Sequence, residues 1–187
     1  MMTPPDRAFF ARPADIVAPA LLGCVLCRTI DGQPRRARII ETEAYLGPRD
    51  LASHSSKGRT ARTEVMFGPP GHAYVYFIYG MHWMLNVTAG EVGHAHAILI
   101  RAAEPLDDWS IDLTGPGKLA RGFAITRADN AADLLAHDLQ LMLDPAHRPR
   151  IRKTRRIGID YAKHWKTRLL RYIDTTSPLA ARLPRPR

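Results

Sequence analysis

The sequence predicts a single α+β domain around a largely antiparallel sheet. Its 187 residues, 45% of them hydrophobic, are enough for one full core and short for two, because domains typically contain roughly 100–200 residues. Predicted strands and short helices follow one another without regular β-α-β alternation. Turn signals such as Asp31-Gly32 join neighbouring strands directly, which is typical of antiparallel pairs. A doubly wound nucleotide-binding fold is therefore not indicated.

The N-terminal quarter predicts a short helix followed by a β-hairpin. Apolar residues recur at helical spacing over residues 13–22, where Pro13 suits a first helical turn and Gly23 suits the end. Residues 24–30 form a predicted strand, and residues 36–45 return beside it after Asp31-Gly32. This hairpin carries the acidic segment 41–45 at its far end.

The remainder of the chain predicts further strands separated by loops. Residues 46–71 are rich in Gly, Pro, Ser and basic residues and are expected to form an irregular, functional loop. A second hairpin follows over 72–88, with a tight turn at Gly80-Met81. The other expected elements are strands at 97–102, 138–143, 156–159 and 171–173, a short helix near 118–120 and a flexible tail at 175–187 with three prolines.

The positive charge is concentrated near the C-terminus. Residues 148–187 contain 13 Lys and Arg against two acids, whereas residues 1–147 contain 14 against 16, for a net charge of +9. A concentrated basic region is typical of proteins that bind phosphate backbones. A basic tail that aids solubility or contacts lipid is the alternative on composition alone.

Targeting signals and metal motifs are weak. No run of 18 apolar residues occurs and the first residues do not form a signal peptide, so we expect a cytoplasmic protein with no membrane partner. We also expect a monomer. Cys24 and Cys27 supply only half of a zinc site and are interpreted as structural thiols. His94 and His96 share a strand face without further ligands at typical spacing. We therefore expect no metal and no cofactor.

The first candidate chemical group lies at the end of the first hairpin. On a strand, Glu41, Glu43 and Tyr45 point to one face. Carboxylates two residues apart crowd each other, and one that is partly desolvated beside an aromatic ring can act as a general base for water. A solvated strand face is the simpler interpretation of this pentapeptide alone.

The second candidate group is aromatic. Tyr74, Tyr76, Tyr79 and Trp83 lie within ten residues around the second hairpin. Aromatic side chains on a basic protein suit base stacking, worth about 1–3 kcal/mol per base, and a side chain at a hairpin tip can act as a wedge between base pairs. An aromatic-rich core strand is the alternative.

Together these segments closely resemble the alkyladenine (3-methyladenine) DNA glycosylase family. The matching blocks span roughly residues 20–160 in the family's order, whereas 128–153 and 163–172 match less well. The matching blocks are Arg38 to Pro48, Ala52-Ser53-His54, Met66 to Met81, Leu85-Asn86-Val87, Ile98 to Leu106, Gly115 to Leu119 and Arg156 to Ile159. The resemblance implies a mixed α/β domain with a curved antiparallel sheet and a protruding hairpin, similar to the formyltransferase C-terminal domain.

The resemblance also assigns roles to individual residues. Glu43 matches the general base that activates water, and Arg101 matches the arginine that helps hold this water. A main-chain carbonyl in Ile157-Gly158-Ile159 is the expected third element of the water site. The other matching residues are Tyr45, His54 and Tyr76, which contact the flipped base, Asn86, which opposes an exocyclic 2-amino group, and Tyr79 with Met81, which enter the duplex.

The implied activity is monofunctional base excision on double-stranded DNA containing damaged purines, which leaves an abasic site. A lyase would need an amine nucleophile, and Lys118, the only lysine inside a matching block, has no such role in the family. A noncatalytic binder of damaged DNA or RNA and an RNA-binding formyltransferase-like domain are the alternatives. The range of lesions among 3-methyladenine, 7-methylguanine, hypoxanthine and ethenoadenine is open, as is the identity of any general acid.

Overall fold

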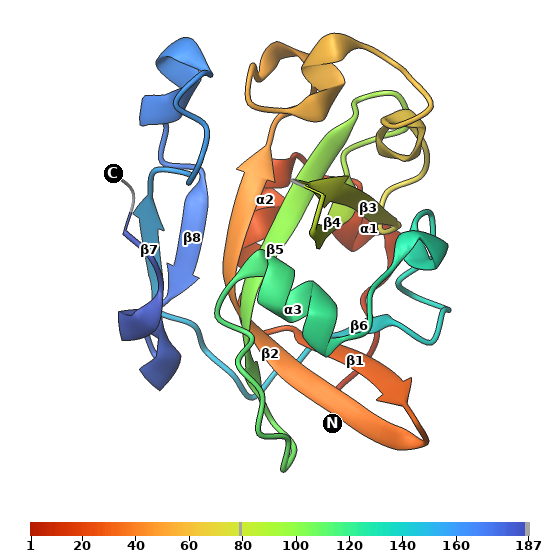
Figure 1. The fold of residues 1–187 in the computed structure, drawn as a ribbon, viewed down its shortest axis with the longest axis vertical. Helices are drawn as coiled ribbons and strands as arrows, with labels where there is room; N and C mark the ends of the chain where they lie inside the picture. Colours follow the sequence, from red (N-terminus) through yellow and green to blue (C-terminus); the bar gives the residue numbers. More distant parts are fainter. Residues whose placement is uncertain (79, 186–187) are drawn as a thin grey trace.

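The computed structural model describes residues 1–78 and 80–185 and is built on one curled antiparallel sheet of eight strands (Figure 1). Six strands are paired in the order β3-β4-β5-β2-β1-β6, while β8 pairs with β2 and β7 pairs with β8. Their bounds are β1 Val25–Ile30, β2 Gln33–Tyr45, β3 Ala73–Ile78, β4 His82–Ala89, β5 His96–Pro105, β6 Gln140–Met142, β7 Ile151–Thr154 and β8 Arg171–Asp174.

Strand β2 is the centre of this arrangement. One edge of its 13 residues pairs with β5, and the other edge pairs first with β1 and then with β8. The pairing with β5 is irregular on both sides of Glu41, as expected for a bulge, which bends a strand and increases its twist. The C-terminal half of β2 is therefore enclosed by strands on both sides, and its residues from Ile39 to Ala44 are buried.

Helices are short and lie around the sheet. The α-helices are α1 Arg7–Phe10, α2 Ala14–Ala20 and α3 Pro116–Gly122, and the 3-10 helices are η1 Gly47–Arg49, η2 His54–Lys57, η3 Glu64–Phe67, η4 Arg127–Asp129, η5 Lys163–Thr167 and η6 Pro178–Arg182. Helix α1 begins at Asp6, whose side chain accepts a hydrogen bond from Phe9 N at 2.8 Å and so satisfies a free helix donor. Helix α2 begins after Pro13 and packs on β2 and β5.

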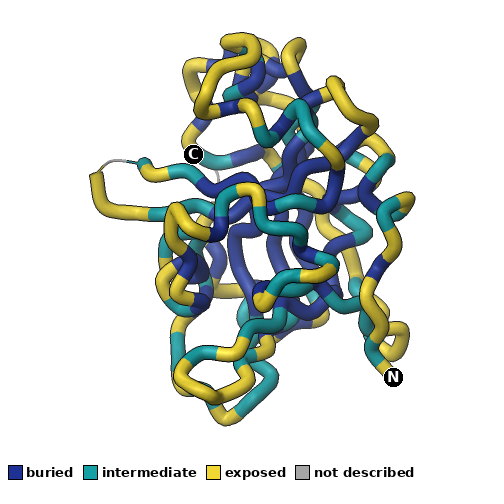
Figure 2. The backbone as a smooth tube through the Cα atoms, turned by 90° about the vertical axis from the view of Figure 1, so that its right-hand side faces the viewer, coloured by how far each residue is buried: buried dark blue, intermediate teal, exposed yellow. Residues whose placement is uncertain are grey.

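The hydrophobic core lies between the sheet and these helices. Its main cluster contains fully buried side chains from α1, α2, β1 and β5, such as Phe10, Val17, Leu26 and Ile98. Figure 2 shows the buried backbone at the centre, with the end of the β3–β4 hairpin extending away from the body of the molecule. Among the described residues, no helix has the length and apolar character needed to cross a lipid bilayer.

The predicted mixed fold with an antiparallel sheet is confirmed, but two predicted segments differ. Residues 156–159 are not a strand, and the nearby strand β7 ends at Thr154. Gly158 has a φ of +73°, which is incompatible with an extended strand. Residues 175–185 are not a free tail, because Ala180 and Leu183 pack on a second apolar cluster with Ile40 and Ile173. Apolar burial therefore holds this segment despite its prolines.

Candidate active site

A cavity of about 310 Å³ opens between the second hairpin, β2, β5 and the segment between β2 and β3. Eight residues named from the sequence line it together, although they come from five separate parts of the chain. They are Tyr45, His54, Tyr76, Asn86, Arg101, Ile157, Gly158 and Ile159. The sheet brings them together because β4, β5 and β2 are neighbours, and the segment 157–159 crosses beside the end of β2.

Glu43 is fully buried beside this cavity. Its Oε2 accepts a hydrogen bond from the Tyr45 hydroxyl at 2.9 Å, and its Oε1 accepts one from Ile157 N at 2.8 Å. The nearest guanidinium nitrogen of Arg101 lies 3.5 Å from Oε1. Hydrogen bonds of this kind hold a carboxylate in one position. Glu43 therefore has a fixed orientation and several donors for its charge.

Glu41 has different surroundings, although it is only two residues away. Its Oε1 accepts hydrogen bonds from Arg101 Nε at 2.7 Å and from Arg171 Nε at 2.6 Å. Its Oε2 is buried without a hydrogen-bond partner among the described residues. Burial lowers the pKa of Arg101, but the carboxylates of Glu43 and Glu41 more than offset this and raise it overall. The solvated strand face that the pentapeptide allowed is absent here, since both glutamates are fully buried.

Aromatic rings form one wall of the cavity. The His54 ring packs edge-on against Tyr76 with centroids 4.5 Å apart, and His54 Nδ1 is hydrogen-bonded to the Tyr74 hydroxyl at 2.8 Å. Burial, aided by the charge of Arg62, lowers the pKa of His54 to about 4. His54 is therefore neutral at pH 7. Burial also raises the pKa values of Tyr45 and Tyr76, so their hydroxyls stay protonated.

Two further contacts fix residues that line the cavity. The Arg156 guanidinium lies 4.7 Å from the centroid of the Tyr45 ring and donates to both carboxylate oxygens of Asp50. Asn86 Nδ2 donates to the main-chain oxygen of Tyr74 at 3.1 Å, which fixes the orientation of its amide. The polar side chains around the cavity thus have partners within the fold, as preorganised sites require.

The structure also places residues at the cavity that the sequence did not identify. Tyr161 lines it and its hydroxyl donates to the Ala52 main-chain oxygen at 3.5 Å. The Arg62 guanidinium lies 5.2 Å from the centroid of the Tyr76 ring. The only sequence feature that could have pointed to Tyr161 is its aromatic ring two residues after the segment 157–159. Met81 is 64% exposed on the hairpin and does not line the cavity, and Tyr79 lies outside the described residues.

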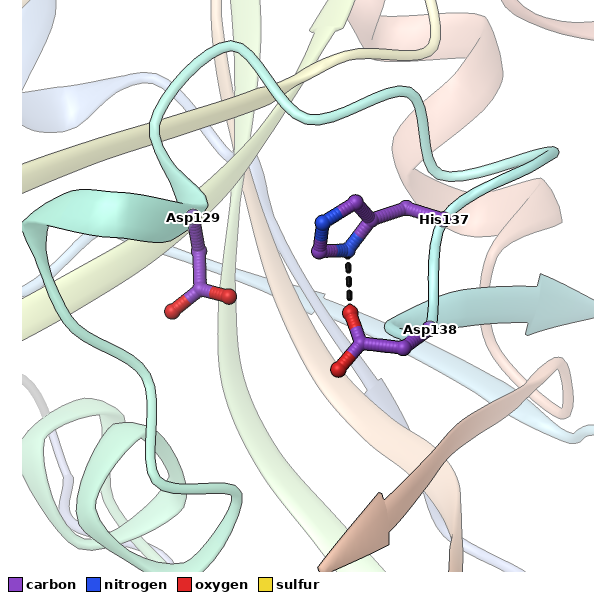
Figure 3. Close-up of side chains that lie close together, drawn as sticks. All are labelled: Asp129, His137 and Asp138. Carbon is purple, nitrogen blue, oxygen red and sulfur yellow. Dashed lines mark ion pairs between the residues drawn. The ribbon is translucent and has the colours of Figure 1, made fainter.

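The described residues contain one group with the geometry of metal ligands. Ligand atoms of Asp129, His137 and Asp138 lie within 4.8 Å of one another (Figure 3). The Arg28 guanidinium already bonds both aspartates, at 2.9 Å and 3.2 Å. Because this cation pairs with both carboxylates, the group forms an ion-pair cluster that ties β1 to the segment before β6. His94 and His96 do not belong to it.

Comparisons with known proteins identify the family of the chain. The model of the methylpurine-DNA glycosylase family matches residues 8–178. A protein of Anaeromyxobacter dehalogenans is 45% identical over 179 residues, 95% of this chain and 85% of its own, and one of Legionella pneumophila is 44% identical over 174 residues, 92% of this chain and 94% of its own. Both bear the name "Putative 3-methyladenine DNA glycosylase". The chain therefore belongs to the methylpurine-DNA glycosylase family.

Proposed function

We propose that this protein removes alkylated purines from double-stranded DNA by hydrolysing the N-glycosidic bond with a water molecule that Glu43 activates. Membership of the family supports the enzyme class, a DNA glycosylase of alkylation repair. The observation that carries the mechanism is the buried carboxylate of Glu43 beside an aromatic-lined cavity and Arg101. A pure binding module has no need for such a carboxylate.

The cavity suits a base that has left the duplex. A stacked base hides its glycosidic bond, so the enzyme has to flip the nucleotide out, at a cost of a few kcal/mol that is smaller for damaged pairs. A volume of about 310 Å³ is at the small end of ligand pockets, as a single base requires. Tyr79 and Met81, which follow β3 in the hairpin, would fill the vacancy in the stack.

The lining supports selection of alkylated purines. An alkylated purine carries positive charge, and a cation over an aromatic face gains about 0.5–2 kcal/mol. Tyr45 and Tyr76 present such rings to the cavity. Asn86 lies in the wall with its amide fixed by Tyr74, where it would oppose the 2-amino group of an undamaged guanine.

Glu43 would serve the reaction in two ways. Departure of the base leaves an oxocarbenium-like sugar, which a nearby carboxylate stabilises while it deprotonates the attacking water. Arg101 and the main chain of 157–159 would hold that water. Lys118 forms an ion pair with Asp112 at 2.6 Å and does not line the cavity, so we expect no Schiff base and a product with an intact backbone at the abasic site.

The test is replacement of Glu43 by Gln. Its amide oxygen can still accept from Ile157 N, but it cannot take a proton from water. We expect single-turnover release of 3-methyladenine to fall by about 10²–10⁴-fold, the usual contribution of a general base, while binding to lesion-containing DNA persists.

The control is Glu64→Gln, because the Glu64 side chain is 55% exposed and, within residues 1–78 and 80–185, forms an ion pair only with Arg59. Base release should be unchanged in this variant. Products should show strand breaks only after alkali treatment. Base release that survives in Glu43→Gln would contradict the assignment of the base, and prompt nicking by the native protein would contradict simple hydrolysis.

A further inference from the structure

The basic residues of this chain fall into two groups. In the N-terminal part many arginines have carboxylate partners, such as Arg7 with Asp133, Arg36 with Asp107, Arg38 with Asp144 and Arg59 with Glu64. Among the described lysines and arginines after residue 147, only Arg156 and Arg171 form ion pairs. The excess charge at the C-terminus is therefore largely unpaired, and unpaired cations are free to bind an external anion.

Three of these unpaired cations line one groove. A second cavity, of about 510 Å³, is lined by Arg155, Lys166 and Arg185 with a single acid, Asp160. All three cations are exposed, and none forms an ion pair with a carboxylate in residues 1–78 or 80–185. We call this cavity the basic groove. Its composition suits an anionic ligand.

The basic groove adjoins the base-binding cavity. Both are lined by the segment 157–159, so this segment separates them. Gly158 is exposed, and a Cβ added to it would meet no atom within 4 Å. A ligand can therefore approach the main chain closely at this point. Ile157 N reaches Glu43 from the same segment.

Folded elements hold the main chain at or next to each cation of the groove. Arg155 directly follows β7, Lys166 belongs to η5, and Arg185 follows the packed residue Leu183. Arg171 on β8 donates to the Pro184 main-chain oxygen at 2.8 Å, which fixes the chain next to Arg185. In Figure 1 these elements form a layer beside the end of β2. Cations on a fixed main chain bind an anion at a lower entropic cost than cations on a mobile segment do.

We propose that the basic groove binds a phosphodiester of the damaged strand next to the flipped nucleotide. This inference rests on the proposed function, because a nucleotide whose base lies in the first cavity must leave its own phosphates just outside it. Guanidinium groups donate two parallel hydrogen bonds to phosphate oxygens. The groove would thus hold the sugar over Glu43 while the hairpin occupies the position that the flipped base leaves in the duplex.

The experiment pairs a protein change with a DNA change. Binding is measured in the Glu43→Gln background, so that the lesion stays intact, on duplexes carrying one uncharged methylphosphonate at each position flanking the lesion. The protein changes are Arg155→Ala and Lys166→Ala. The matched control is Arg148→Ala, since Arg148 is exposed, forms no ion pair in the described part of the chain and lies at the opposite end of β7.

We expect one methylphosphonate position to weaken binding of the parent protein but to weaken binding of Arg155→Ala or Lys166→Ala much less. The dependence of log K on log salt should also become shallower by roughly 0.9 for each phosphate contact that is lost. Any effect of Arg148→Ala on binding should be the same whichever flanking phosphate carries the methylphosphonate.

The proposal would be overturned if Arg155→Ala and Lys166→Ala weakened binding by the same factor whichever flanking phosphate carried the methylphosphonate. A circular-dichroism spectrum and melting temperature equal to those of the parent separate this outcome from misfolding. The proposed function fails in a different way, through absence of base release by the native protein. The two failures are therefore distinguishable.

Discussion

At the scale of single residues, the structure separates two glutamates that the sequence left side by side. Glu41 shares one oxygen between Arg101 and Arg171, so its charge is used to balance buried cations. Glu43 instead receives a phenol hydroxyl and a main-chain N–H beside the cavity. Carboxylates with different surroundings take different roles. Glu41 is thus suited to hold Arg101, and Glu43 to act on a ligand.

His54 gives a prediction on pH at the same scale. Its pKa is lowered to about 4, chiefly by burial and then by the charge of Arg62, whereas an unfolded histidine titrates near 6.5. Between these values the unfolded state binds more protons, so His54 contributes to a loss of stability as the pH falls from 6.5 towards 4.

The comparison uses His54→Gln, which does not titrate. Urea unfolding at pH 7 and at pH 5 should show a larger loss of unfolding free energy for the native protein than for this variant. Equal losses would mean that His54 gains a proton as readily in the folded protein as in the unfolded chain.

At the scale of elements, the segment 157–159 links the interior to both cavities. It begins after Arg156, which Asp50 and the Ala44 main-chain oxygen hold in the interior. It then gives one hydrogen bond to Glu43 and lines both cavities. A main-chain change here should therefore affect activity more than stability.

Gly158→Ala tests this, with Gly32→Ala as control. Both glycines have a φ of +73°, and neither would place a new Cβ within 4 Å of another atom. The left-handed conformation should cost each variant about 1–2 kcal/mol of unfolding free energy. Only Gly158→Ala should lose base release in a single-turnover assay. Equal activities of the two variants would show that the segment does not position the reacting groups.

At the scale of the whole molecule, the C-terminal segment completes the fold. Residues Ala180 and Leu183 pack on Ile40 of β2 and Ile173 of β8, on the strand pair that carries Glu41 and Arg171. The last described residues therefore pack on the two strands that carry Glu41 and Arg171. Its loss should destabilise the molecule rather than release a tail.

Leu183→Ala should lower the unfolding free energy by roughly 2–5 kcal/mol, as for other buried leucines. Leu183 is 6% exposed, whereas Leu169 is 54% exposed, so Leu169→Ala should change stability by less than about 0.5 kcal/mol. Chemical denaturation measures both. A Leu183 variant as stable as the Leu169 variant would restore the interpretation of a loosely attached tail.

The sequence by itself determined the fold class and most members of the site. Alternating apolar residues, Asp31-Gly32 and the second hairpin act over a few residues, so they predict strands and antiparallel pairs directly. Family motifs named the residues that the fold brings to one cavity, from Tyr45 to Ile159. Local patterns and motifs therefore predict the features that depend on residues close together in the sequence.

Only the tertiary structure decided how charge is distributed between these residues. Partners of Glu41 and Arg156 lie 60 to 130 positions away in the chain, and no local pattern specifies such pairs. The same holds for Leu183, whose burial depends on Ile40 and Ile173, and for the basic groove, which needs β7, η5 and the chain after η6 together. Long-range packing brings these charged residues together and removes water from around them, so their arrangement exists only in the folded protein.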